Sequence, residues 1–510
     1  MFNKENTNVI LGPPGTGKTT SLLNKLEAEI EAGVKPRTIG FVSFTRRAIK
    51  ESRERTISRF DINEETDLDY FRTLHSICFR SLGLNGKQIF KGSHVTEFKK
   101  LLKIDMSGGV EEDEIVTSGI KIGDKMLFCD QLARAMMKPL RDTWRSLDCE
   151  YSWKEQELFS NTFRKFKEKR GLSDFTDMLI TFLKEGVAPP LKVLFVDEAQ
   201  DLTILQWKVV SKLVENCDRL YIAGDDDQTI YKWAGADIDT FLNLKGNIEV
   251  LPYSYRLPSK VYDLAIEISS RIKNRFAKEW KSRKEEGTVN YVSAIEYIDM
   301  KEGPWLILSR YNYQLYSIQK FLKTQGFVFE NKYGGFKANK HVQGIRAWKK
   351  LMNKEKIVYE EIKKLYSCLR TGSGIERGFK NLKTIDGDII NYHKEEFDLE
   401  SLRMHHGLKA KGKWQEALEM IPEEDKYYYE ALEKTGDINE DSPRIRLSTI
   451  HGSKGAEADN VVLLTDVSYK TWKNLVKDDD DEHRVFYVGI TRVKNNLFIV
   501  NPQTEYSYRI

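Results

Sequence analysis

The chain has 510 residues, a length at which one hydrophobic core no longer grows, so we expect roughly three to four domains. Charged residues make up 31% and hydrophobic residues 40% of the chain, with no apolar run long enough to span a bilayer and no apolar leader after Met1, which predicts a soluble, cytoplasmic protein with no membrane partner. The five cysteines form no close pairs of the kind that bind zinc. The net charge is only +4, so a site for a polyanion would have to be formed by a local cluster of basic residues.

Apolar runs in chain order predict two parallel sheets. The first set is NTNVIL at 6–11, RTIGFVSFT at 37–45, LKVLFVDEA at 191–199 and RLYIAGD at 219–225. The second set is GPWLILSR at 303–310, RIRLSTIHG at 444–452, NVVLLTD at 460–466 and NLFIV at 496–500. The runs at 37–45, 191–199 and 219–225 end in polar residues, and polar strand ends are where open α/β sheets place their sites.

Two stretches rich in helical pattern and charge interrupt these sets, and we interpret both as insertions. The fold class is therefore α/β, with two parallel-sheet domains that each carry a mostly helical insertion. The predicted domains are 1–79 with 172–256 for the first sheet, 80–171 for its insertion, 257–345 with 441–510 for the second sheet and 346–440 for its insertion.

The sequence GPPGTGKT at 12–19 fits a phosphate-binding loop, and it stands between a strand and a helix as that motif requires. Backbone N–H groups of such a loop surround the phosphates, the lysine reaches the β and γ oxygens, and the threonine can ligate Mg²⁺. The alternative is a glycine-rich turn with a surface lysine. The residues expected at the nucleotide are Gly12, Pro13, Gly15, Thr16, Gly17, Lys18, Thr19 and Thr20.

An acidic pair follows a strand in VLFVDEAQD, and it supplies the second half of a hydrolytic site. We expect Asp197 to bind the metal together with Thr19, and Glu198 to orient or deprotonate the attacking water. Phosphoryl transfer also needs cations at the γ-phosphate, for which Arg256 and Arg492 are candidates. For each arginine a surface salt bridge is the alternative.

The stretch AGDDDQTIYKWAGAD at 223–237 crowds carboxylates against large rings. Taken alone, it fits a surface turn whose rings belong to the core. A second acidic run, KDDDDEH at 477–483, fits the N-terminus of a helix or a solvated loop better than a metal site.

The order of these motifs resembles that of the UvrD/Rep/PcrA-type superfamily 1 DNA helicases. The resemblance runs along the whole chain through GPPGTGKTT, VSFTRRAIKESRERT, RTLHSICFR, DFTDML, LFVDEAQD, AGDDDQTIYKWAGAD, SYRLPS, LSTIHGSKGAEADNVVLL and HRVFYVGITRVKNNLFIV. It implies two RecA-like domains of the P-loop NTPase class, with ATP between them and single-stranded DNA across them.

The resemblance also assigns residues. Gln228 would sense the γ-phosphate, Arg256 and Arg492 would be arginine fingers, Glu457 would bind the ribose and Tyr255 would stack on the base. The positions that match DNA contacts in relatives are Phe44, Thr45, His75, Tyr231, Trp233, His451 and Lys454.

The stretch at 223–237 is then interpreted as a coupling element, with Gln228 toward the nucleotide and the rings of Tyr231 and Trp233 toward bases. We expect Asp225 to Asp227 to be structural, without a catalytic role. Relatives carry an adenine-reading glutamine upstream of the phosphate loop, for which the start of this chain leaves no room, so the base preference stays open.

Three functions follow. The first is an ATP- and Mg²⁺-dependent DNA helicase that acts on single-stranded DNA and single/double-strand junctions, with a polarity of 3′ to 5′ implied by the resemblance. The second is a translocase or nucleoprotein remodeller that separates few strands, and the third is an NTP-gated binding subunit of a larger complex. RNA stays open as a substrate, because stacking and phosphate contacts do not read the sugar. Protein partners are not predicted.

Overall fold

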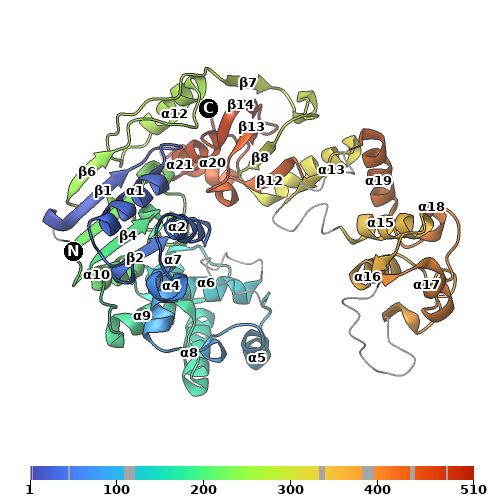
Figure 1. Ribbon diagram of the computed structural model, residues 1–510, viewed down its shortest axis with the longest axis horizontal. Helices are drawn as coiled ribbons and strands as arrows, with labels where there is room; N and C mark the ends of the chain where they lie inside the picture. The colour runs from blue at the N-terminus through green and yellow to red at the C-terminus, as the bar shows by residue number, and fades with distance from the viewer. Residues whose placement is uncertain are drawn as a thin grey trace. The chain divides into compact units, whose positions relative to one another are not determined.

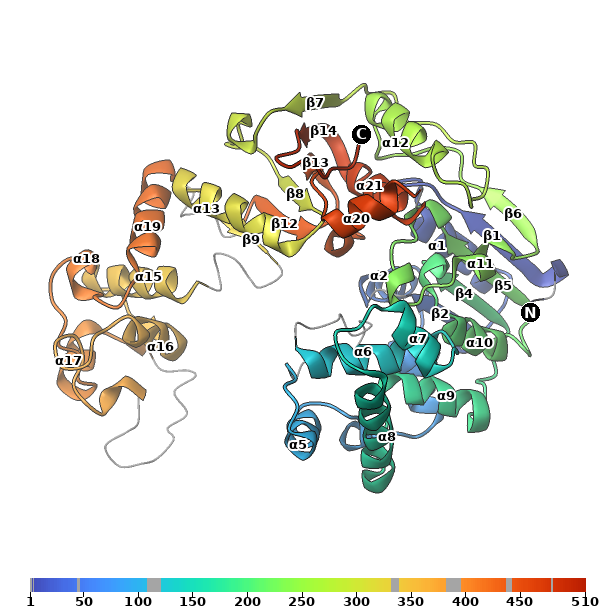
Figure 2. The ribbon, with the colours of Figure 1, turned by 180° about the vertical axis from the view of Figure 1, so that it is seen from behind.

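The computed structural model describes residues 2, 4–43, 46–107, 121–331, 339–381, 396–436, 443–477 and 480–510. The chain divides into two compact units, which are labelled by element in Figure 1 and seen from behind in Figure 2. The first unit contains Met1–Gly287 and Asn474–Thr491, and the second contains Thr288–Lys473 and Arg492–Ile510.

A six-stranded parallel sheet forms the centre of the first unit, in the order β3-β2-β4-β5-β1-β6. Its strands are β1 (Thr7–Leu11), β2 (Ile39–Ser43), β3 (Phe71–Arg72), β4 (Val193–Asp197), β5 (Arg219–Gly224) and β6 (Asn247–Val250). The helices that connect them are α1 (Lys18–Glu31), α2 (Arg46–Arg59), α3 (Glu64–Asp67), α4 (Leu74–Ser81), α9 (Phe175–Glu185), α10 (Ile204–Leu213), α11 (Ile238–Leu242) and α12 (Ser259–Ser270).

The strands β2 and β4 are buried at every residue, and because neighbouring residues along a strand point to opposite sides, both faces of the sheet are covered there. In β4, Leu194 and Val196 pack with helices α4, α9 and α10, whereas Val193 and Phe195 pack with α1. This double burial explains why the strands are continuous apolar runs in the sequence.

The insertion of the first unit is helical, with α5 (Ser93–Leu102), α6 (Ile122–Ala135), α7 (Leu140–Ser146) and α8 (Trp153–Arg170). Its core is rich in aromatic rings, and Phe98 of α5 lies 5.2 to 5.3 Å from the rings of Phe159, Phe163 and Phe166 of α8. These ring contacts join two helices that are far apart in the sequence.

The second unit has its own six-stranded parallel sheet, in the order β7-β14-β13-β8-β12-β9. Its strands are β7 (Thr288–Val292), β8 (Trp305–Ser309), β9 (Phe329–Glu330), β12 (Ile445–Thr449), β13 (Ala458–Leu464) and β14 (Val493–Val500), with helices α13 (Leu315–Gln325) and α20 (Tyr469–Leu475).

The insertion of the second unit contains one small antiparallel strand pair among its helices. Its elements are α15 (Lys340–Met352), β10 (Ile357–Val358), α16 (Tyr359–Ser367), β11 (Glu396–Phe397), α17 (Leu399–His405), α18 (Trp414–Ala417) and α19 (Glu423–Thr435). Trp348 and Tyr366 are fully buried here and belong to the same apolar core as Ile307 of β8.

The predicted fold class of two parallel-sheet α/β domains is confirmed, and all eight predicted strands form. The short edge strands β3, β6, β7 and β9 were not predicted, since two to five residues at a sheet edge leave a weak pattern. The division of the chain into two units also differs from the predicted domain bounds. The first unit includes residues 257–287 and 474–491, both of which were predicted to belong to the second domain. Helix α21 (Asp480–Ile490) lies in the latter segment.

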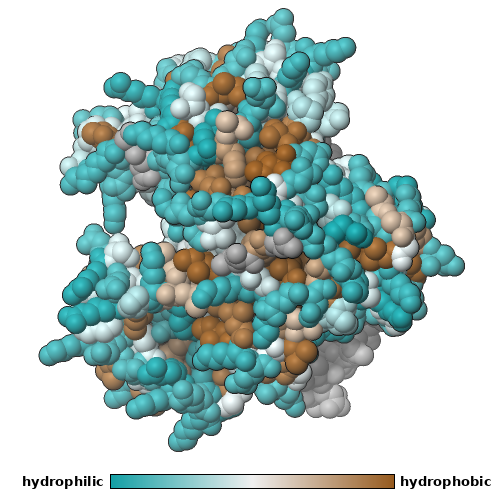
Figure 3. All heavy atoms as spheres, turned by 90° about the vertical axis from the view of Figure 1, so that its left-hand side faces the viewer, coloured by the Kyte–Doolittle hydropathy of each residue, from teal (hydrophilic) through white to brown (hydrophobic). Residues whose placement is uncertain are grey.

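Hydrophilic side chains cover most of the face drawn in Figure 3, and apolar residues form separate patches between them. In the part of the chain that the structure describes, no helix is both long and apolar enough to cross a bilayer.

We expect Phe98→Ala to destabilise the first insertion by about 3–5 kcal/mol, because it removes a ring at the centre of the aromatic core. Hydrogen exchange of the α8 amides measures this loss. Leu101→Ala is the matched control, since Leu101 lies on the same helix with 58% of its surface exposed. Equal acceleration of exchange in both variants would contradict the prediction.

Candidate nucleotide and nucleic-acid site

The predicted site residues of the first unit follow the carboxyl ends of parallel strands. Gly12 follows β1, Asp197 ends β4, Asp225 follows β5 and Arg256 lies beyond β6. Because all six strands run in the same direction, these ends meet at one edge of the sheet, where open α/β sheets bind ligands.

The phosphate loop has the backbone that its glycines permit. Gly15 and Gly17 have φ values of 72° and 78°, in the left-handed region, and Gly17 caps helix α1. The loop is held from within by the hydroxyl of Thr16, which donates to the carbonyl of Pro13 at 2.7 Å. Lys18 Nζ donates to the carbonyl of Gly12 at 3.0 Å. Both hydrogen bonds are internal to the loop and hold its backbone at the start of α1.

The acidic pair lies directly beside the loop. Thr19 Oγ1 donates to Asp197 Oδ2 at 3.0 Å, and Lys18 Nζ lies 3.9 Å from Glu198 Oε1. Burial, reinforced by the charge of Glu198, raises the pKa of Asp197 to about 7. Glu198 has a φ of 53°, an uncommon value for a residue with a side chain, and such strain is often held at functional sites.

Residues 254–256 pack on the phosphate loop from the other side. Ser254 Oγ donates to the carbonyl of Pro14 at 2.7 Å, and the N–H of Tyr255 donates to the carbonyl of Gly15 at 2.9 Å. A Cβ on Gly15 would lie 2.3 Å from the Cβ of Arg256, so the approach requires a glycine. The ring of Tyr255 is 72% exposed and lies 5.1 Å from that of Tyr253.

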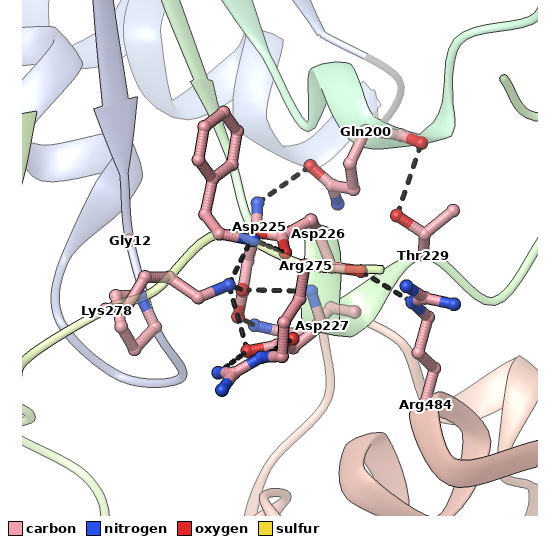
Figure 4. A network of polar contacts seen from close by, with 12 residues as sticks. Gly12, Gln200, Asp225, Asp226, Asp227, Thr229, Arg275, Lys278 and Arg484 are labelled. Atoms are coloured by element: carbon pink, nitrogen blue, oxygen red, sulfur yellow. Dashed lines mark hydrogen bonds and ion pairs between the residues drawn. The ribbon is translucent and has the colours of Figure 1, made fainter. Parts of the chain in front are cut away.

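Gln228 is connected to the acidic pair by a chain of hydrogen bonds, part of which is drawn in Figure 4. Gln200 Nε2 donates to Glu198 Oε2 at 2.6 Å, and its Oε1 accepts the N–H of Asp225 at 3.1 Å. Asp225 Oδ2 in turn accepts from Gln228 Nε2 at 2.7 Å. Gln200 is fully buried, and sequence reasoning missed its role although it stands within the VLFVDEAQD motif.

The three aspartates of this segment form ion pairs with one lysine whose side chain is buried. Lys278 Nζ contacts all three carboxylates, within 2.7 Å of Asp225, 2.5 Å of Asp226 and 2.9 Å of Asp227. Burial would raise the pKa of Asp225, but the charge of Lys278 holds it below its ordinary value. Burial raises the pKa of Asp226 to about 6. Lys278 had no signal of its own in the sequence.

The two rings of the segment lie beyond this buried cluster. Trp233 is 42% exposed, and its ring lies 6.4 Å from that of Tyr231 and 6.1 Å from that of Phe128. Phe128 belongs to helix α6 of the insertion, a third ring that the sequence did not indicate. The insertion therefore supports the aromatic pair.

His75 lies close to the acidic pair. His75 and Asp197 line one small cavity together with Ser43 and Thr73, and the His75 ring meets the edge of Phe175 at 5.8 Å. Two further candidates, Phe44 and Thr45, lie outside the described residues.

The candidates in the second unit fall at opposite ends of its strands. His451 and Lys454 follow the carboxyl end of β12, whereas Glu457 and Arg492 immediately precede the amino ends of β13 and β14. Since these strands are parallel, the first two residues start from one edge of the sheet and the last two lie at the other. Glu457 pairs with Lys494 at 2.6 Å, and Arg492 is 2% exposed.

Known domains match almost the whole chain. Residues 1–249 match the UvrD/REP helicase N-terminal domain, and residues 151–504 match the UvrD-like helicase C-terminal domain. The chain belongs to the UvrD-like helicases. As a member of that family it is a DNA-dependent ATPase of the helicase class.

Several relatives of this UvrD-like helicase have known names. A probable DNA helicase II homolog of Mycoplasma capricolum is 24% identical, over 98% of this chain and 82% of the relative. The ATP-dependent DNA helicase PcrA of Bacillus subtilis is 23% identical over 55% of this chain and 39% of its own length. PcrA of Staphylococcus aureus is 24% identical over 58% of this chain and 42% of its own length.

We expect Gly15→Ala to weaken ATP binding, because the added Cβ would collide with Arg256. Gly33→Ala is the matched control: its φ of 92° imposes a similar backbone strain of about 1–2 kcal/mol, but no atom lies within 4 Å of the added Cβ. Titration with a fluorescent ATP analogue compares the two. Retention of wild-type affinity in Gly15→Ala would contradict the packing described for residues 254–256.

Proposed function

We propose that this UvrD-like helicase translocates along single-stranded DNA from 3′ to 5′ and separates strands at a junction. The polarity rests on the family resemblance, and one observation supports the coupling of ATP hydrolysis to DNA. The segment 225–233 is anchored to Glu198 through Gln200 at one end and presents Tyr231 and Trp233 at the other. The same segment is thus proposed to contact the nucleotide at one end and DNA at the other.

The nucleotide proposed for the loop is ATP with Mg²⁺. Mg²⁺ is usually held by one or two carboxylates together with substrate phosphates, and Thr19 with Asp197 offers such a partial ligand set. The raised pKa of Asp197 supports this assignment, because a cation would stabilise the carboxylate form that burial disfavours. When bound, the ion would neutralise charge on the β and γ oxygens.

The remaining nucleotide roles belong to side chains. Lys18 is proposed to bind the phosphates and Glu198 to orient the attacking water as its general base. Family resemblance supports the assignment of Gln228 as the γ-phosphate sensor and of Arg256 and Arg492 as the cations at the γ-phosphate. Tyr255, which is largely exposed beside the loop, is proposed to stack on the base, and Glu457 to bind the ribose.

On the DNA side, Trp233 and Tyr231 are proposed to stack on bases, a contact that every base can make. His75, His451 and Lys454 are proposed as further contacts by resemblance. Hydrolysis would be coupled to DNA because ATP and DNA act on the same hydrogen-bonded segment. For this coupling to work, ATP must bind one arrangement of the segment more tightly than the other.

We expect strand separation only on duplexes with a 3′ single-stranded tail, with ATP hydrolysis followed in parallel. Lys18→Ala is the control and should abolish hydrolysis, because the phosphates lose their side-chain cation. DNA-stimulated hydrolysis without strand separation on either tail would support a translocase or remodeller instead. Tight DNA binding with negligible turnover would support an NTP-gated binding subunit.

We expect Trp233→Ala to lower DNA-stimulated turnover more than basal turnover, because stacking of one base on an aromatic ring contributes about 1–3 kcal/mol. The corresponding loss of DNA affinity is about 5-fold to 140-fold. Tyr427→Ala is the control, since Tyr427 is 68% exposed on α19 of the second insertion. An equal loss of basal and stimulated turnover in Trp233→Ala would contradict the coupling.

A further inference from the structure

Three consecutive carboxylates are buried in the first unit. Asp225, Asp226 and Asp227 are each 0% exposed. Moving an ionised carboxylate out of water costs several kcal/mol unless cations and hydrogen bonds replace its hydration. The segment that holds Gln228 can therefore keep its conformation only while its cationic partners stay in place.

Two of these partners come from the chain between α12 and β7. Lys278, which is fully buried, contacts all three carboxylates, and Arg275 donates to both oxygens of Asp227, with its Nε at 2.7 Å from Oδ1. Figure 4 shows both cations pointing at the aspartates.

The third cationic side chain is Arg484 of helix α21, which is 2% exposed. Its Nε donates to the carbonyl of Asp226 at 3.0 Å, and its Nη2 donates to the carbonyl of Asn274 at 2.6 Å. On the same helix, the Asp480 carboxylate accepts the backbone N–H groups of Lys273 and Asn274, each at 3.0 Å. One helix is thus fastened to both the aspartate segment and the residues that carry its cations.

The far end of α21 is held as well. Arg256 Nη1 donates to the carbonyl of Thr491 at 3.3 Å, and Arg492 is the next residue. In the sequence α21 stands between two strands of the second sheet, yet it packs in the first unit. The backbone that leads into Arg492 is therefore fixed at Asp480, at Arg484 and at Thr491.

We propose that Arg484 is a positioning residue for Arg492. By tying α21 to the aspartate segment, it fixes the backbone that leads into Arg492. The inference rests on the proposed function, in which Arg492 is a cation at the γ-phosphate. A displacement of about 1 Å at such a group can lower the rate about 100-fold.

A double-mutant cycle on the full-length protein tests this role. We expect Arg484→Met to lower kcat for DNA-stimulated ATP hydrolysis about ten-fold or more, with KM for ATP changed by less than about two-fold. In an Arg492→Ala background, Arg484→Met should cause no further loss, because the residue acts only through Arg492. Multiplicative losses in the double variant would overturn the proposal.

A partly exposed residue gives the same test with less risk to folding. Asp480→Ala releases the start of α21 and should repeat the non-additive loss with Arg492→Ala, including where circular dichroism shows that Arg484→Met does not fold. Asp398→Ala is the matched control, because Asp398 caps α17 through the N–H of Ser401 at 2.8 Å, far from α21 in the sequence. An equal loss of kcat in Asp398→Ala would overturn the proposal.

Different results would contradict the role of Arg492 at the γ-phosphate and the positioning role of Arg484. If Arg492→Ala alone leaves kcat unchanged, the role of Arg492 in the proposed function is wrong, and the role of Arg484 falls with it. If Arg492→Ala lowers kcat but Arg484→Met and Asp480→Ala do not, only the positioning role is wrong.

Discussion

The pairing of three buried carboxylates with cations is the interaction on which the site depends. Asp225, Asp226 and Asp227 leave water together, and the charges of Lys278 and Arg275 take the place of that water, while Arg484 donates to the backbone carbonyl of Asp226. Lys278 lies 53 residues beyond Asp225, and Arg484 lies 258 residues beyond Asp226, so the cluster forms only when the chain has folded back on itself. The same requirement explains why 257–287 and α21 pack with the first sheet.

The rest of the nucleotide site follows from the parallel sheet. The strands β1, β4 and β5 end at the same edge of the sheet. Their ends therefore bring together the phosphate loop, the acidic pair and the aspartate segment, which are far apart in the sequence. Glycine then allows close approach, as at Gly15, where the chain of Arg256 comes within contact of the loop. Burial and the neighbouring charge of Glu198 raise the pKa of Asp197 to about 7.

The arrangement accounts for a motor better than for a simple hydrolase. A hydrolase needs the loop, the acidic pair and the arginines, whereas this site continues through Gln200 and Asp225 to a pair of rings supported by Phe128. In the second unit the candidates for nucleotide and for DNA stand at opposite ends of parallel strands, so one sheet can serve both ligands. Arg484 ties α21, the helix that precedes Arg492 in the chain, to the aspartate segment.

The sequence by itself determined the fold class, the eight main strands, the phosphate loop and the acidic pair, because each depends on local pattern and on fixed spacing along the chain. It also indicated that Asp225 to Asp227 are structural. Only the tertiary structure decided which cations pair with them, that Gln200 bridges Glu198 to the Gln228 segment and that Phe128 supports Trp233. It likewise placed α21 in the first unit. These contacts join residues far apart in the chain, and a lysine or an arginine looks the same in the sequence whether water or buried carboxylates surround it.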